Sequence, residues 1–255
     1  MVVLLSVLVA LTLFGVALIF IYYQKLFRLY RFQQNFINGF THELKTPIAS
    51  LRLYLDTFLK YDLSKEEQTQ YLTYMLNDTE RLNQNVNQIL QIAKIEDKNF
   101  KPSFQKADII ELVKSVPIKN PHYFETLDIS FKETSEKYEV DIVPDLIELV
   151  VMNLITNAVN YNESEDPKLE ISFEKSDKYI VTTFKDNGIG LDKTEFKNVF
   201  KKMYQVGKST KGSGLGLYLS HNVVKIHKGK LRVSSSGLGK GSAFCLYLPL
   251  PKDEQ

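Results

Sequence analysis

The chain has 255 residues, 44% of them hydrophobic, which suits one membrane anchor and about two small packed domains. Its formal net charge of +2 gives no reason to propose a nucleic-acid partner. The single cysteine, Cys245, excludes an internal disulfide; it lies in an apolar, strand-like run, which predicts a buried thiol in a reducing compartment.

The first 23 residues are predicted to be a single transmembrane anchor. Residues 2–22 are almost wholly apolar, and at about 1.5 Å per residue they span roughly 30 Å, the thickness of the hydrocarbon layer. Two tyrosines follow where an interfacial aromatic belt would lie, and then three basic residues: Lys25, Arg28 and Arg31. The positive-inside rule therefore places the rest of the protein in the cytoplasm, with the anchor in the inner (cytoplasmic) membrane.

A cleaved signal peptide is the alternative reading of this segment. It would need a basic start and a small-residue cleavage site, and neither is evident. Because the anchor begins at the first residues, we expect no extracellular sensor domain before it. The input would then arrive elsewhere, or the chain would be a shortened version of a longer one.

Residues 24–97 are predicted to form an antiparallel hairpin of two long helices. The first helix carries an apolar stripe with steps of three and four: Phe36, Phe40, Leu44, Ile48, Leu51 and Leu55. Its pattern breaks at residues 61–63, and Ser64 with Glu67 forms a capping box that begins a second helix running to about Glu96. A lone hairpin leaves its apolar seam half exposed, so we expect a homodimer with a four-helix bundle. An intrachain coiled coil is the alternative.

One histidine in the first helix stands in a distinctive context. His42 lies about 100° from the apolar stripe, so its ring should face water. Glu43 follows directly, and Pro47, one turn later, removes a backbone hydrogen bond. A solvent-facing imidazole beside a carboxylate is a candidate nucleophile; an ordinary surface histidine is the alternative. A zinc motif of the H-E-x-x-H kind is excluded, because Thr46 stands where the second histidine is required.

Residues 98–106 are polar and contain Pro102, so we expect a linker there, followed by a domain over residues 107–251. Helices are expected at 108–116, 144–161 and 215–227, and strands at 127–132, 138–143, 169–174, 179–185, 231–235 and 243–248. Runs of strands and helices of this kind indicate an α+β fold, here an α/β sandwich with helices on one face of the sheet.

The helix expected at 144–161 carries three asparagines on one face, Asn153, Asn157 and Asn160. Asparagine is a mediocre helix former, so three on one stripe is unusual. Amide oxygens can coordinate Mg²⁺, a hard cation that keeps part of its water shell and binds substrate phosphates. The alternative is a solvated polar face.

Two glycine-containing stretches follow. Residues 186–190, DNGIG, end an expected strand with a carboxylate, Asp186, that can accept from an amino group, while glycines let the backbone pass close to a flat ligand. Residues 212–217, GSGLGL, lead into a helix and could cradle an anion. They fit neither a Rossmann loop, which needs a preceding strand, nor a Walker A loop.

Taken in chain order, these motifs resemble the membrane-bound sensor histidine kinases of bacterial two-component systems. FTHELKTP resembles the family's H box, NLITNAVNY its N box, DNGIG its G1 box, FKKMY its F box and GSGLGL its G2 box. Residues 239–242, GKGS, match its closing turn before the last strand. The resemblance covers about residues 32–249.

The resemblance implies a role for each matching residue. His42 would accept the γ-phosphoryl group of ATP, Glu43 would orient its ring, and Thr46 would orient water when the regulator is dephosphorylated. The nucleotide would be bound by Asn153, Asn157, Asn160, Tyr161, Asp186, Gly188, Gly190, Tyr204, Lys208, Lys211, Gly212, Gly214, Leu215 and Gly216. Within that set, Asn157 would ligate Mg²⁺ and Asp186 would accept from the adenine amino group.

The resemblance also implies a partner: phosphotransfer to an aspartate of a separate response regulator receiver domain. Two positions depart from the family pattern, because Asn160 and Gln205 stand where positive residues are usual. Lys201, Lys202, Lys208 or Lys211 would have to supply that charge. The alternative function is a non-catalytic, nucleotide-binding dimeric membrane scaffold, which these two positions favour.

Overall fold

The computed structural model describes residues 1–97, 99–134, 136–207 and 213–251. Seven side chains within α1 also lie outside the described part: Arg28, Leu29, Phe32, Gln33, Asn35, Phe36 and His42. The chain divides into two compact units, residues 1–82 and residues 83–255.

The first unit begins with one long helix, α1 (Val2–Lys60). Its stretch Val2–Phe27 is long and apolar enough to cross a membrane, and its side chains contact little else in the structure. The helix continues through Pro47, as the sequence pattern predicts. An apolar stretch at this position fits the predicted single-pass anchor.

A short connection leads from α1 to α2 (Lys65–Glu96). The predicted capping box is present: the Ser64 N–H donates to Glu67 Oε2 at 2.9 Å, and the Glu67 N–H donates to Ser64 Oγ at 3.3 Å. Near this turn, rings from both helices pack edge-on or tilted, with Tyr54 and Phe58 of α1 against Tyr71 of α2 at centroid distances of 5.7 and 6.2 Å. The two helices therefore form the predicted hairpin.

Helix α2 carries two parallel stripes with steps of three and four. One stripe is buried or half-buried: Tyr71, Met75, Asp78, Leu82, Asn85, Ile89 and Ile92. The neighbouring stripe is exposed and contains four large apolar side chains: Leu72 (56% exposed), Leu76 (60%), Val86 (38%) and Leu90 (61%). Val86 and Leu90 repeat Leu72 and Leu76 two heptads later, which is the pattern of a helix that packs on a partner along a seam.

The second unit contains the end of α2 and an α+β domain. Its helices are α3 (Ile109–Lys119), η1 (Pro121–Tyr123), α4 (Pro144–Asn160), η2 (Lys193–Glu195) and α5 (Gly216–Ile226). Its strands are β1 (Gln105–Asp108), β2 (Asp128–Phe131), β3 (Glu139–Ile142), β4 (Lys168–Lys175), β5 (Tyr179–Asp186), β6 (Lys230–Ser234) and β7 (Ala243–Pro249). A five-stranded sheet has the order β2-β4-β5-β7-β6, and β1 pairs with β3 in a separate antiparallel ribbon.

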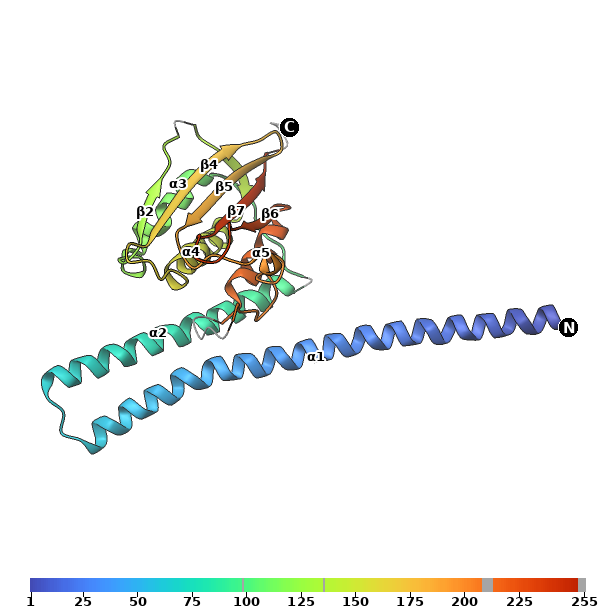
Figure 1. The fold of residues 1–255 in the computed structure, drawn as a ribbon, viewed down its shortest axis with the longest axis horizontal. Helices are drawn as coiled ribbons and strands as arrows, with labels where there is room; N and C mark the ends of the chain where they lie inside the picture. The colour runs from blue at the N-terminus through green and yellow to red at the C-terminus, as the bar shows by residue number, and fades with distance from the viewer. Residues whose placement is uncertain (98, 135, 208–212, 252–255) are drawn as a thin grey trace. The chain divides into compact units, whose positions relative to one another are not determined.

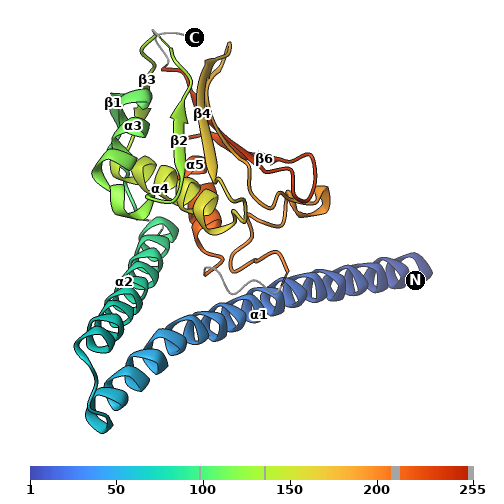
Figure 2. The same ribbon diagram turned by 60° about the vertical axis from the view of Figure 1, so that its left-hand side comes forward.

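Helices α3, α4 and α5 lie along one face of the five-stranded sheet (Figures 1 and 2). Strands β4, β5 and β7 alternate between buried and more exposed residues, as expected for a sheet covered on one side. Phe184 of β5 and Leu246 of β7 point into this core, together with Ile155 of α4, and each is at most 1% exposed. The predicted fold class, an α+β chain with helices on one face of the sheet, is confirmed.

Two expectations need correction in detail. The sequence pattern does not predict β1, which begins at Gln105 inside the expected linker, because its four residues lack an apolar alternation; pairing with β3 makes it a strand. The Cys245 thiol is only half-buried. In β7 the neighbours Phe244 and Leu246 face the helices, so Cys245 lies on the opposite face, where Thr183 Oγ1 donates to its sulfur at 3.7 Å.

Candidate functional site

A carboxylate at the end of β5 is the centre of the site. Asp186 is half-buried, and its Oδ1 accepts from the backbone N–H groups of Gly188 at 2.8 Å and Ser242 at 3.1 Å. Burial raises the pKa of this carboxyl, and the two N–H donors oppose that shift. Both of these bonds end on Oδ1, and acceptance by Asp186 from an amino group of a ligand stays a prediction.

The backbone after Asp186 is wedged between two other loops. The Ile189 N–H donates to the Tyr161 carbonyl at 3.0 Å, on the side of α4. On the other side, the Gly241 N–H donates to the Gly188 carbonyl at 3.0 Å. A Cβ at Gly188 would lie 2.4 Å from the Tyr161 carbonyl oxygen. Close packing of main chains therefore requires this glycine, whatever ligand is bound.

Gly190 is constrained in the same way. Its φ is +69°, and a Cβ there would lie 2.2 Å from the carbonyl oxygen of Gly237. Close backbone packing alone therefore explains why both positions are glycine. That these glycines also leave space for a flat ligand stays a prediction.

The asparagine face of α4 divides into two parts. Asn153 Nδ2 donates to the carbonyl of Gly216 at 3.4 Å and to Ser220 Oγ at 3.3 Å, so this amide joins α4 to the start of α5. Asn157 Nδ2 is buried and has no hydrogen-bond partner among the described residues. A buried N–H donor without a partner is unfavourable, and such donors are found where an acceptor atom of a ligand or a water completes the set.

The last two candidates on α4 lie at its end. Asn160 is the final helical residue and Tyr161 caps the helix, and both are half-buried. The structure therefore brings Asn157, Asn160 and Tyr161 to the edge of the sheet where Asp186 lies, because the Tyr161 carbonyl is bonded to the loop that follows Asp186.

The glycine-rich stretch before α5 meets the loop that precedes it. The Met203 N–H donates to the Gly214 carbonyl at 2.9 Å, and a Cβ on Gly214 would lie 2.8 Å from the Met203 carbonyl carbon. Met203 and Gly214, which flank the segment between them, are therefore in direct contact. Tyr204 lies just inside this segment and donates its hydroxyl to Glu195, a bond that raises the pKa of Tyr204. Lys208, Lys211 and Gly212 lie outside the described residues.

At the other end of this stretch, Leu215 is the N-cap of α5, and Gly216 is its first residue. The N–H groups of the first helical turn have no partner within the helix, which makes this end suitable for an anion. The side chain of Asn153 lies next to it, since a Cβ on Gly216 would be 3.2 Å from Asn153 Oδ1.

The candidate nucleophile belongs to the first unit. His42 lies within α1, and its side chain lies outside the described part of the structure. Glu43 is 19% exposed, and its Oε2 lies 3.9 Å from Arg81 Nη2 of α2. Thr46 is exposed. The orienting role of Glu43 and the water-orienting role of Thr46 stay predictions.

Comparison with known proteins identifies two domains. Residues 32–98 match the His Kinase A (phospho-acceptor) domain, and residues 142–252 match the Histidine kinase-, DNA gyrase B-, and HSP90-like ATPase. The chain is 30% identical over 238 residues to the sensor protein RprX of Bacteroides fragilis, covering 89% of this chain and 45% of that protein. It is 27% identical over 230 residues to SrrB of Staphylococcus aureus, covering 86% and 38%.

The chain belongs to the sensor histidine kinases. It spans less than half the length of these two curated relatives. Among solved structures, the histidine kinase AdeS of Acinetobacter baumannii superimposes with a TM-score of 0.65 at 23% identity, covering 83% of this chain and 98% of that one. ThkA in complex with the response regulator TrrA gives 0.68 at 20%, covering 84% and 61%. At these identities the likeness supports the fold alone.

One lysine of the kinase F box is already paired. Lys202 has a side chain only 6% exposed, and its Nζ lies 3.0 Å from Glu96 Oε1. It also lies 5.3 Å from the centroid of the Tyr218 ring. The Tyr218 hydroxyl donates to the same Glu96 oxygen at 2.8 Å, and burial, followed by this bond, raises its pKa to about 12. In this conformation Lys202 pairs with Glu96, and a role for Lys202 beside a phosphate stays a prediction.

Several residues of the site were missed from the sequence. Ser242 holds Asp186 through its backbone N–H, and the Ser235 hydroxyl accepts from the Leu191 N–H at 3.1 Å. The family-like turn at residues 239–242 was the available signal for Ser242, because the backbone N–H groups of this turn need hydrogen-bond acceptors and find them at Asp186 and Gly188. The side chain of Asn187 was also missed, because Asp-Asn-Gly resembles an ordinary turn.

Proposed function

We propose that this chain is an ATP-dependent protein-histidine kinase that phosphorylates its own His42. The observation that carries the proposal is the pairing of two parts in one chain. A helical hairpin matches the phospho-acceptor domain around His42, and an ATPase fold carries Asp186 with its carboxylate fixed by two backbone N–H groups. The ATPase part would bind the nucleotide, and the hairpin would present the imidazole.

The described residues fit an adenine nucleotide. Asp186 Oδ2 would accept from the adenine amino group, and the N-terminus of α5, at Leu215 and Gly216, would face the phosphates. Tyr204, Lys208, Lys211, Gly212 and Gly214 would close over them. The full-length ShkA structure in complex with AMPPNP, a neighbour at TM-score 0.61 and 21% identity, supports a nucleotide in this fold.

The donor set also fits Mg²⁺. The described residues contain no cluster of three or more histidine, cysteine or acidic side chains that could hold a metal. Mg²⁺ does not need one, because it prefers oxygen ligands and keeps waters and substrate phosphates. Asn157 would supply the protein ligand through its carbonyl oxygen Oδ1, while its buried and unpartnered Nδ2 could donate to a phosphate oxygen. Bound Mg²⁺ would neutralise charge on the phosphates as transfer proceeds.

Three further parts of the proposal concern partners and place. We expect a homodimer, because the exposed stripe of α2 and the exposed Ile48 and Leu55 of α1 would be covered by a second copy. We expect phosphotransfer to an aspartate of a response regulator receiver domain, supported by the structure of ThkA with its regulator. The apolar start of α1 would anchor the kinase in the cytoplasmic membrane, with the catalytic part in the cytoplasm.

The deciding experiment is labelling with ATP carrying a radioactive γ-phosphate. We expect label that is stable in alkali and labile in acid, and that disappears in His42→Gln. His122→Gln is the matched control, since His122 is exposed and lies in the ATPase unit; it should keep its label. Equal labelling of the His42 variant would refute the assignment. Nucleotide binding without any phosphohistidine would select the scaffold alternative.

We also propose that the kinase removes the phosphoryl group from its regulator. Glu43 to Thr46 match the family's E-x-x-T pattern, and Thr46 is exposed on α1, where it could orient an attacking water. Thr46→Ala should slow dephosphorylation of the phosphorylated regulator while labelling of His42 continues. Unchanged dephosphorylation in that variant would refute the phosphatase role.

A further inference from the structure

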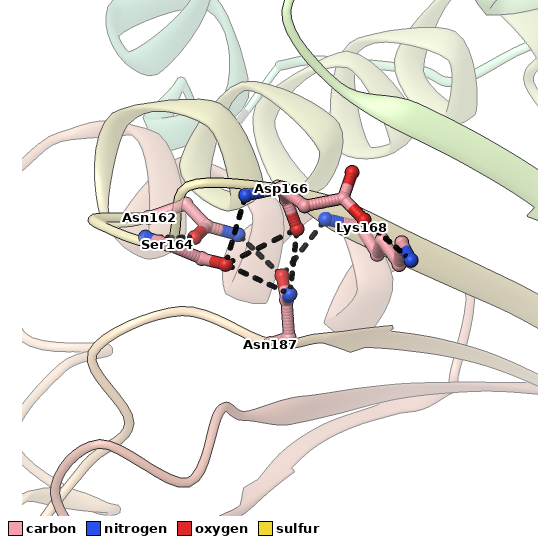
Figure 3. Close-up of polar contacts among 5 residues, drawn as sticks. All are labelled: Asn162, Ser164, Asp166, Lys168 and Asn187. Carbon is pink, nitrogen blue, oxygen red and sulfur yellow. Dashed lines mark hydrogen bonds and ion pairs between the residues drawn. The ribbon is translucent and has the colours of Figure 1, made fainter.

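The side chain of Asn187, in the loop after β5, contacts the segment that leads from α4 into β4 (Figure 3). Its Oδ1 accepts from Asn162 Nδ2 at 2.7 Å and from the Lys168 N–H at 2.8 Å. Its Nδ2 donates to the Asp166 carbonyl at 2.9 Å and to Ser164 Oγ at 3.3 Å. One carboxamide thus uses both acceptor positions and both donor hydrogens.

Three of the four partners, Asn162, Ser164 and Asp166, belong to the segment between α4 and β4, and the fourth, Lys168, is the first residue of β4. This segment has its own internal bonds: the Ser164 N–H donates to Asn162 Oδ1 at 3.0 Å, and the Asp166 N–H donates to Ser164 Oγ at 3.2 Å. Those bonds shape the loop but do not attach it to β5. The bonds to Asn187 join residues that are 19 to 25 positions apart, so they attach this segment to the end of β5, whereas a turn residue bonds only its near neighbours in the chain.

The position of Asn187 gives this connection a consequence for the site. Asn187 follows Asp186 directly, and the clamped loop begins at Tyr161, whose carbonyl accepts from Ile189. On one side of the clamp lies the carboxylate proposed to bind adenine. On the other lies the end of α4, with Asn157 and Asn160. Together with the backbone bond from Ile189 to Tyr161, the clamp therefore fixes the distance between the two groups that would hold the nucleotide.

We propose that Asn187 is a positioning residue that sets the affinity of the site for adenine nucleotides. All four side-chain bonds of Asn187 go to protein groups, so it acts by holding the loop after α4 against the end of β5. The inference rests on the proposed nucleotide site and assigns to it a residue outside the expected ligand set. Because the network of Asn187 lies at the surface, loss of the clamp should leave the core of the domain folded.

Asn187→Asp is the sharpest test, since it changes shape very little. The carboxylate keeps both acceptor bonds, loses the donors to Asp166 and Ser164, and sets a negative oxygen against the Asp166 carbonyl. We expect ADP binding, measured by isothermal titration, to weaken about fivefold or more. KM for ATP should rise by a similar factor while kcat changes less than about twofold, because the histidine is not affected.

Two controls separate this from a general loss of stability. Asn120→Asp removes a comparable donor bond, from Asn120 Nδ2 to the Val116 carbonyl at 2.9 Å, far along the chain from the site; it should leave ADP binding unchanged. Ser164→Ala should weaken binding less than Asn187→Asp, and adding it to Asn187→Asp should have little further effect, because both act through one network.

The outcomes are distinct. Wild-type ADP affinity in Asn187→Asp, or an equal loss in Asn120→Asp, would overturn the inference. Weaker ADP binding confined to the Asn187 and Ser164 variants would support it even if His42 were never labelled, in which case the kinase proposal alone would fail. A wild-type chain that bound no ADP would overturn both.

Discussion

The two compact units bury their apolar residues to very different extents. In the ATPase unit the core closes within one chain, and large side chains such as Phe184 and Ile155 are at most 1% exposed. In the helical hairpin, apolar residues follow a regular seam but remain open; Leu72 and Leu76 are 56% and 60% exposed. A two-helix hairpin has one layer and cannot cover both sides of its own seam, whereas a sheet with three helices can.

The end of α2 also differs from the loop after β5 in its polar groups. Asn85 Nδ2 and Gln91 Oε1 are buried there without a hydrogen-bond partner among the described residues. Around Asp186 and Asn187, in contrast, backbone and side-chain groups are joined by many short bonds. Asn157 Nδ2 and His221 Nδ1 of the ATPase domain are also buried without a partner among the described residues, so the contrast concerns the loop after β5 and not the whole domain.

The largest expected effect is on the closed core. Phe184→Ala should lower the free energy of unfolding of the ATPase unit by about 3–5 kcal/mol, because it leaves a cavity under α4. Urea unfolding can be followed by tyrosine fluorescence, since the chain has no tryptophan. Ile118→Ala, at a side chain 77% exposed, is the control and should change stability by about 0.5 kcal/mol or less. Similar losses in both variants would mean that the core is not closed.

The next effect concerns the open seam. Leu72→Ala should leave the folded chain intact but weaken the proposed homodimer by about 2 kcal/mol, roughly 30-fold, because symmetry removes two side chains per dimer. Sedimentation equilibrium measures this directly. Leu238→Ala, at a side chain 69% exposed in the ATPase unit, should have no effect on association. If Leu72→Ala dimerised as well as the wild type, something other than a second copy would cover this face.

The sequence predicted well whatever depends on local periodicity. The long helices, the capping box at Ser64 and Glu67, and the alternating strands around Phe184 all follow from spacing along a few turns or pleats. It also indicated where Asp186 would lie, because a strand end beside glycines is a local pattern.

What the sequence could not predict depends on pairs distant in the chain. Strand β1 exists because Gln105–Asp108 pairs with β3, not because of its own residues. The link between Lys202 and Glu96 joins residues that are 106 positions apart, and no local pattern in the chain indicates it. The same holds for Asn187, which resembles an ordinary turn residue until its four partners are known.

A smaller effect is expected from pH in the ATPase unit. His227 is 3% exposed; its Nε2 accepts from the Val143 N–H at 3.0 Å, and its Nδ1 lies 2.7 Å from the Val223 carbonyl. Burial lowers the pKa of His227, and the bond to Val223 opposes that change. Below about pH 6.5 the unfolded chain therefore binds more protons than the folded one. The free energy of unfolding should then fall as pH falls, by at most about 1.4 kcal/mol per pH unit for this one imidazole.

The check on His227 is the slope of stability between about pH 5 and 7. His227→Gln should be flatter than the wild type, though not flat, because burial and Lys225 also lower the pKa of His221. An unchanged slope in His227→Gln would contradict the prediction that burial of His227 makes the stability of this unit depend on pH.

The smallest expected effect compares one helix cap in each unit. Ser64→Ala removes the hydroxyl that accepts from the Glu67 N–H, and Asp108→Ala removes the carboxylate that accepts from the Ile110 N–H at 2.9 Å. Each should cost about 1 kcal/mol. In the hairpin the loss should stay local, with faster hydrogen exchange confined to the first turn of α2, because little else covers that end. In the ATPase unit α3 is part of a closed core, since Ile109 and Val113 are fully buried, so Asp108→Ala should instead lower the stability of the whole unit. Exchange that spread through α2 after Ser64→Ala would show that the hairpin folds as cooperatively as the domain it is compared with.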